Sequence, residues 1–235
     1  RGHLAEATAD ARQVLAAARE GGAAVAGRFG AALLGFIALS TGDHDGAHAQ
    51  LGPLVAALPT TYDPGLARFV PDDVEALARL GDRARAEAVL VPFEAQAVAL
   101  DRPWALAAGG RCRALLASAA GEQNAALEAV AAALAAHERV PMPFERARTL
   151  LVAGSVRRRA RRTGEARTTL EEALAEFERL GASTWAAQAR DELQRIGGRT
   201  AAAPASTPAS TPVLTEAERR IAELVTAGYS NREVA

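Results

Sequence analysis

The densest group of reactive side chains in this sequence is a run of arginines near residue 160. Five guanidinium groups fall within six residues, at Arg157, Arg158, Arg159, Arg161 and Arg162. Such a run could form a patch that binds a nucleic acid or an acidic protein partner. Cations are also favoured at a helix C-terminus, and Glu165, Glu171 and Glu172 follow closely in sequence. The run therefore has two interpretations, a partner patch and an ordinary charged helix end.

A second group holds side chains that could ligate a metal: Asp43, His44, Asp45 and His48. Carboxylates and imidazoles are common zinc ligands, but a complete ligand set is not present here. A capping aspartate and exposed histidines explain the same pattern. We therefore expect no metal site.

The sequence contains no residue pattern that predicts catalysis. Cys112 is the only cysteine, which excludes an internal disulfide and a thiolate zinc site, and we expect it to be a small core residue. Trp104 and Trp185 are expected to pack rather than to bind a ligand. All 27 basic residues are arginine, so a G-x-x-x-x-G-K phosphate loop cannot occur. Neither G-x-S-x-G nor H-E-x-x-H is present. We predict no catalytic residue and no enzyme activity.

Composition and charge indicate an ordinary soluble protein. The chain of 235 residues is 49% hydrophobic and 23% charged, with a formal net charge of −1. A net charge this close to zero does not predict strong non-specific DNA binding, which requires a positively charged surface. There is no signal peptide and no apolar run near the roughly 18 residues of a membrane span. We expect a cytoplasmic protein without membrane contact.

Residues 1–196 show helical periodicity throughout and no strand pattern. Glycine followed by an acid recurs at spacings of 39, 40 and 43 residues, at Gly42–Asp43, Gly81–Asp82, Gly121–Glu122 and Gly164–Glu165. Glycine ends one helix and the acid begins the next, so each unit is predicted to be a helical hairpin. Nine positions after each glycine stands an apolar or small residue of the expected inner face: Leu51, Leu90, Val130 and Ala173.

The breaks between hairpins agree with this period. Pro103–Trp104 and Pro143–Phe144 are expected to open first helices, and Trp185 stands about one repeat later. Pro71 falls within a predicted helix, which should break or kink there. A period near 40 residues is typical of helical solenoids. The fold class predicted for residues 1–196 is all-α, a tetratricopeptide-like helical-hairpin solenoid.

Residues 197–213 and 214–235 have a different character. Residues 197–213 repeat Pro, Ala, Ser and Thr without apolar periodicity and are predicted to be a linker. In the tail, Thr215 and Glu218 form a capping box at a predicted helix start, and Ile221 belongs to the apolar stripe that follows. After Gly228, a second box ends at Glu233. Two short helices joined by a glycine turn predict the start of a helix-turn-helix or a generic helical hairpin.

The tail resembles the start of the LuxR-type helix-turn-helix. The matching residues are Leu214, Thr215, Glu218, Gly228, Ser230, Asn231, Arg232, Glu233, Val234 and Ala235, whereas Ala217 departs from the arginine that is frequent there. In this family the helix that starts near Asn231 is the positioning helix, and the helix that reads the major groove comes next. The resemblance implies that Ser230, Asn231 and Arg232 contact the DNA backbone, and that the chain is cut before the residues that read bases.

Together with the repeats and the linker, this tail resembles the C-terminal end of the large ATP-binding LuxR-type transcription regulators. Residues 157–197 also look like the last repeat before the DNA-binding domain of that group. The resemblance implies an ATPase module before Arg1, with ATP bound in the parent and no cofactor in this chain. It further implies a protein or small-molecule inducer at the repeats and promoter DNA as a partner of the parent. The sequence leaves open whether the protein is a homo-oligomer. The alternative is a helical-repeat scaffold that binds a protein or ligand without binding DNA.

Overall fold

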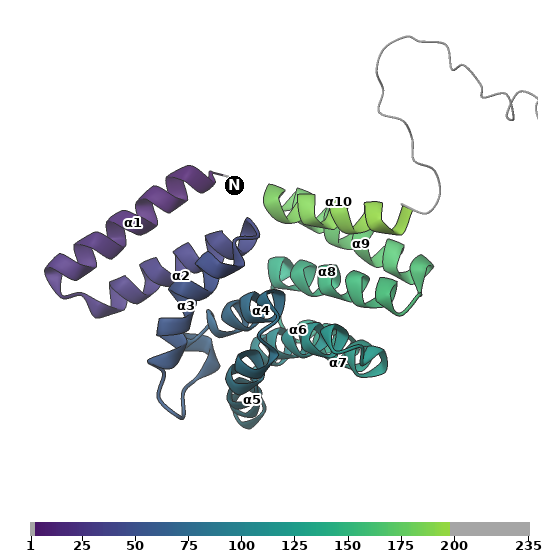
Figure 1. Ribbon diagram of the computed structural model, residues 1–235, viewed down its shortest axis with the longest axis horizontal. Coiled ribbons are helices and arrows are strands. Elements are labelled where there is room, and N and C mark those ends of the chain that lie inside the picture. Colours follow the sequence, from purple (N-terminus) through teal and green to yellow (C-terminus); the bar gives the residue numbers. More distant parts are fainter. Residues whose placement is uncertain (1–2, 198–235) are drawn as a thin grey trace, which may run out of the picture. The chain divides into compact units, whose positions relative to one another are not determined.

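A computed structural model describes residues 3–197, which belong to one compact unit that runs from Arg1 to Arg199. All regular structure in this described part is helical, as the sequence predicts (Figure 1). The helices are α1 Leu4–Gly21, α2 Ala24–Ser40, α3 His44–Ala56, the 3-10 turn Pro64–Leu66, α4 Val70–Leu80, α5 Arg83–Ala99, α6 Pro103–Ala119, α7 Gln123–His137, α8 Pro143–Arg159, α9 Thr163–Arg179 and α10 Ser183–Gly197.

The helices form two layers. Each helix packs against its neighbours in sequence, which gives the hairpins α2/α3, α4/α5, α6/α7 and α8/α9. The even-numbered helices from α2 to α10 also contact one another in turn and form the inner layer of the array. The helices α3, α5, α7 and α9 each pack on the two inner-layer helices next to them in sequence. This arrangement confirms the predicted helical-hairpin solenoid for the described residues.

Three of the four predicted turns are confirmed and one is wrong. Gly42, Gly81 and Gly121 adopt left-handed backbone conformations with φ near 80°. Gly164 instead lies inside α9, and the left-handed residue of the fourth turn in this series is Arg161, with φ 63°. The turns thus recur at 39, 40 and 40 residues. The register of the stacked hairpins fixes where α8 ends, and it outweighs the cost of about 1–2 kcal/mol for placing a non-glycine residue there.

The corrected register explains the inner contacts of each hairpin. Five positions after each left-handed residue stands a fully buried alanine, at Ala47, Ala86, Ala126 and Ala166. Alanine at this position lets the two helices of a hairpin approach closely. Nine positions after the same left-handed residues stand the buried residues Leu51, Leu90, Val130 and Leu170. Ala173, predicted for this last place, is buried as well, but Leu170 is the residue equivalent to the other three.

Two glycines receive these leucines where the helices of a hairpin cross. A Cβ atom added at Gly35 would lie 2.4 Å from Cγ of Leu51, and one added at Gly154 would lie 2.3 Å from Cγ of Leu170. Both distances are shorter than any normal carbon contact. The absence of a side chain at these two positions is therefore required by packing.

This contact predicts opposite effects for two glycine substitutions in the same hairpin. Gly154→Ala should lower the free energy of unfolding by about 1–3 kcal/mol, because the new methyl group overpacks against Leu170. Gly164→Ala, whose Cβ meets nothing within 4 Å, should raise it by about 0.5–1 kcal/mol. Urea unfolding followed by circular dichroism measures both. If Gly154→Ala costs as much in a Leu170→Ala background as it does alone, the steric explanation is wrong.

The prolines and aromatic residues sit where the hairpins stack. Pro103 and Pro143 are the first residues of α6 and α8, as predicted. Trp104 packs edge-on against Phe93, with ring centroids 6.1 Å apart. The helical stretch breaks at Pro71 rather than kinking, because α4 begins at Val70 and its first turn needs no amide donor from Pro71. Residues 198–213 of the predicted linker and 214–235 of the predicted DNA-binding segment lie outside the described residues.

Candidate functional site

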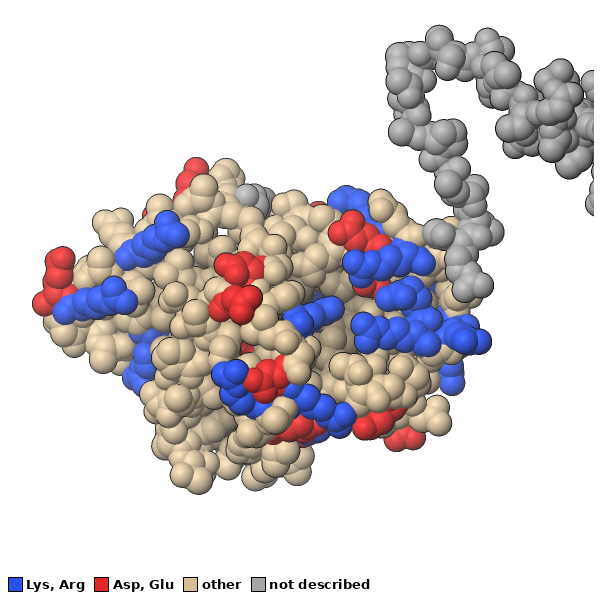
Figure 2. All heavy atoms as spheres, viewed as in Figure 1, with Lys and Arg blue, Asp and Glu red and all other residues tan. Residues whose placement is uncertain are grey.

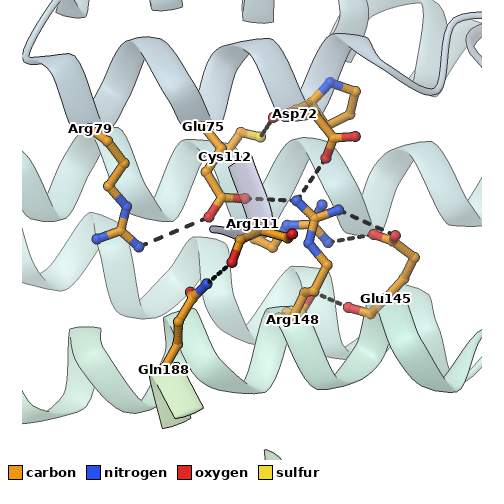
Figure 3. Close-up of polar contacts among 11 residues, drawn as sticks. Asp72, Glu75, Arg79, Arg111, Cys112, Glu145, Arg148 and Gln188 are labelled. Carbon is orange, nitrogen blue, oxygen red and sulfur yellow. Dashed lines mark hydrogen bonds and ion pairs between the residues drawn. The ribbon is translucent and has the colours of Figure 1, made fainter. Parts of the chain in front are cut away.

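Five charged side chains meet inside the inner layer and form what we call the inner ionic cluster. They are Asp72 and Glu75 of α4, Arg111 of α6, and Glu145 and Arg148 of α8 (Figure 3). Asp72 and Glu75 share one face of α4 because they are three residues apart, and Glu145 and Arg148 share one face of α8 for the same reason. The arginines are almost inaccessible to solvent, at 1% and 2% exposure.

Arg148 is the centre of this cluster. Its guanidinium nitrogens lie 2.7 Å from Asp72, 2.9 Å from Glu75 and 3.4 Å from Glu145. The other arginine, Arg111, lies 2.8 Å from the second carboxylate oxygen of Glu145. The cluster thus ties α4, α6 and α8 together through charge-assisted hydrogen bonds.

Arg148 also contacts two aromatic rings from the ends of the array. Its guanidinium carbon lies 4.8 Å from the ring centre of Trp185 in α10 and 5.5 Å from that of Phe36 in α2. The two rings stack on each other at 6.1 Å. Beside them, the side-chain amide of Gln188 in α10 donates to the backbone carbonyl of Ser40 in α2 at 3.0 Å (Figure 3). We call this set the α2–α10 contact.

Burial and pairing act in opposite directions on the three carboxyl groups. Burial raises the pKa of Asp72 above its ordinary value despite the attraction of Arg148. Burial also opposes ionisation of Glu145, but Arg148 and Arg111 outweigh it and lower the pKa of Glu145 to about 2. The pKa of Glu75 is lowered in the same way. Asp72 is therefore the carboxyl group among these three whose pKa is raised rather than lowered.

Cys112 lies next to the cluster and is confirmed as a core residue. It is fully buried, and its thiol donates to the carbonyl of Pro71 at 3.4 Å. Burial raises the pKa of the Cys112 thiol to about 12. The thiol therefore stays protonated at neutral pH and is a poor nucleophile.

His137 of α7 is a second buried polar group. Its Nε2 lies 2.9 Å from the hydroxyl oxygen of Thr149, which itself donates to the carbonyl of Glu145. The hydroxyl hydrogen is thus used, so Nε2 of His137 carries the proton and donates, while Nδ1 is bare. No partner of Nδ1 is found among residues 3–197. Burial and the charge of Arg111 lower the pKa of His137 to about 4.

The carboxylates and guanidinium groups of the inner ionic cluster bind one another, and the Cys112 thiol binds the carbonyl of Pro71. Sequence reasoning missed this cluster because Arg148 lies 73 and 76 residues from its partners on α4. The available signal was an arginine within the apolar stretch ARTLLVAG and another within AAGGRCRALL.

The side chains of the group Asp43, His44, Asp45 and His48 do not converge on one site in the structure. Asp43 caps α3 by accepting from the amide of Gly46 at 2.9 Å. His48 binds Asp73 of α4 at 2.7 Å, a residue outside the predicted group. Across residues 3–197 the structure holds no group of three or more His, Cys, Asp or Glu side chains placed to bind a metal.

The arginine run lies at the end of α8 and in the turn that follows, where Figure 2 shows basic side chains gathered over the α8–α10 part of the array. Most of the run is paired within the chain. Arg158 binds Glu192 at 3.1 Å, Arg157 and Arg162 each lie 3.8 Å from Glu165, and Arg159 donates to Ser118 at 3.3 Å. Arg161 has no carboxylate within ion-pair distance in the described part of the chain. The partner patch stays a prediction.

The residues predicted from the tail cannot be placed in this way. The backbone-contact candidates Ser230, Asn231 and Arg232 lie outside the described residues, as do the cap residues Thr215, Glu218 and Glu233. The described helices include none that is long and apolar enough to span a membrane.

Comparison with known proteins identifies the fold and no family. No family model matches the sequence, and no curated protein matches it. Among solved structures the chain is similar to the crystal structure of BtubC (BKLC) from P. vanneervenii, at 15% sequence identity and a TM-score of 0.52. The similarity covers 92% of this chain and 99% of that chain. At this identity the likeness supports the all-helical architecture alone.

Proposed function

We propose that this chain belongs to a DNA-binding transcriptional regulator of the LuxR type, in which the helical array is the sensor or interaction module. The observation that carries the proposal is the ten-residue match within residues 214–235, which follows a helical array and a Pro/Ser/Thr-rich stretch. The described array supports the sensor role, because stacked helical hairpins commonly provide an extended binding surface. In this proposal Ser230, Asn231 and Arg232 bind the DNA backbone.

One observation favours the alternative, a repeat scaffold that binds a protein without binding DNA. The inner helix α2 exposes three large apolar side chains at four-residue spacing, Val25, Phe29 and Leu33, with exposures of 57%, 72% and 42%. Residues four apart lie on the same side of a helix, so these three form one apolar stripe. Such a stripe is typical of a protein interaction surface.

Genomic DNA selection with the full gene product distinguishes the two functions. We expect the protein to enrich specific promoter fragments and a form that ends at Gly197 to enrich none, because that form lacks the tail. Arg232→Ala should weaken binding to every selected fragment and lower the slope of log affinity against log salt by about one.

Arg161→Ala is the matched control, since it removes the same charge from an exposed arginine of the array. It should leave the affinity unchanged. If Arg161→Ala weakens binding and Arg232→Ala does not, the DNA surface is the arginine run and the proposed role of the tail is wrong. If the full gene product enriches no DNA, the scaffold function replaces the regulator.

A further inference from the structure

The array is closed on itself by a small number of side chains. The α2–α10 contact joins residues 148 positions apart, through the Gln188 amide, the Ser40 carbonyl and the stacked rings of Phe36 and Trp185. Its residues sit in the last two turns of α2 and the first two turns of α10. The hairpins between these helices are joined instead by extensive packing of neighbouring helices.

Neither end of the array depends on this contact for its own core. Helices α8, α9 and α10 bury Leu170, Phe177 and Ala186 against one another. At the other end, α2 and α3 bury Leu39 and Ala47. Only Phe36 crosses from α2 into the core at the C-terminal end, and it is partly exposed there. Separating α2 from α10 would therefore leave each helix packed on its sequence neighbour.

The surface that such a separation uncovers holds the rings of Phe36 and Trp185 and, next to them, charged side chains. Directly beneath the two rings lies Arg148, held by Asp72, Glu75 and Glu145. Buried ions gain hydration when water reaches them, whereas an apolar core of the same size would lose stability when it opens. A layer of ion pairs at this point thus lowers the cost of opening.

We propose that the α2–α10 contact is a reversible closure, which releases α10 from α2 as a rigid-body movement while all helices stay folded. Local opening below the threshold of global unfolding is a general property of folded proteins. Here it is confined to the α2–α10 contact and to the packing of the Phe36 ring on Phe144 and Arg148 of α8. The proposal is independent of whether residues 214–235 bind DNA.

Trp185 provides a direct reporter of this closure. The chain has two tryptophans, so Trp104→Phe leaves Trp185 as the only one. Trp185 is 5% exposed when the contact is made. In a urea titration of the full chain with this background, we expect acrylamide quenching of Trp185 to rise several-fold at a lower urea concentration than the loss of helical circular dichroism.

Substitutions within the α2–α10 contact should change the urea concentration at which Trp185 becomes exposed, and not the concentration at which helical circular dichroism is lost. Gln188→Ala, which removes the amide donor, should shift the exposure of Trp185 to lower urea, and Phe36→Ala should expose Trp185 without urea. Gln194→Ala is the matched control, because this exposed glutamine lies on the same helix away from α2. It should shift neither transition.

Hydrogen exchange separates rigid-body release from unravelling of α10. Under conditions where Trp185 is exposed, the backbone amides of α10 should remain protected. If these amides lose protection at the same urea concentration at which Trp185 becomes exposed, the helix frays and the proposed closure is wrong. The same conclusion follows if quenching and circular dichroism change together in the parent and in all three variants.

Discussion

Arg148→Met should lower the free energy of unfolding by about 3–5 kcal/mol, the largest effect we expect from any single substitution in the array. Methionine keeps the apolar stem and removes the charge that the buried carboxylates of Asp72 and Glu75 face. Asp72 then has no hydrogen-bond donor among the described side chains. Urea unfolding followed by circular dichroism at neutral pH gives the value.

Arg146→Met is the matched control for this experiment. Arg146 lies on the same helix and pairs with Glu172 at 2.7 Å, but both side chains are nearly half exposed. Its removal should cost less than about 1 kcal/mol. A second variant tests the cause: adding Asp72→Asn to Arg148→Met should restore part of the lost stability, because it removes a buried charge without a partner. If Arg148→Met and Arg146→Met lower the free energy of unfolding equally, burial of the inner ionic cluster does not increase its contribution to stability.

His137 should make the array less stable as the pH falls below neutrality. An unfolded histidine takes up a proton near pH 6.5, whereas in the folded state burial and Arg111 lower the pKa of His137 to about 4. Between these values the unfolded chain binds a proton that the folded chain does not, so acidification favours unfolding. The lost stability amounts to about 3 kcal/mol, from about 1.4 kcal/mol for each pH unit.

His137→Gln isolates this effect. A glutamine amide can still donate to Thr149 but has no group that titrates in this range. The free energy of unfolding of the variant should therefore fall by about 3 kcal/mol less than that of the parent between about pH 7 and pH 4. His3→Gln, at an exposed position near the start of the array, should follow the parent. Parallel curves for the parent and His137→Gln would show that the imidazole is protonated in the folded state.

Much of the architecture could be predicted from local signals. Glycine at the left-handed turn, aspartate at the helix start and proline at the first helical position act within a few residues of where they stand. This is why the turns at Gly42, Gly81 and Gly121 and the helix starts at Pro103 and Pro143 are confirmed. The same local reasoning failed at Gly164, where the spacing of the stacked hairpins selects Arg161 instead.

The sequence by itself determined the helices, the turns at Gly42, Gly81 and Gly121 and the apolar face that follows each of them, because these depend on the residues of one helix and its turn. Only the tertiary structure decided that Asp72, Glu75, Glu145 and Arg148 meet, and that α10 returns to α2. Those contacts depend on the small rotation between successive hairpins, summed over the whole array. The residues of one repeat do not specify this accumulated rotation. A charged residue on an apolar helix face therefore predicts that a partner exists, but the sequence does not identify that partner.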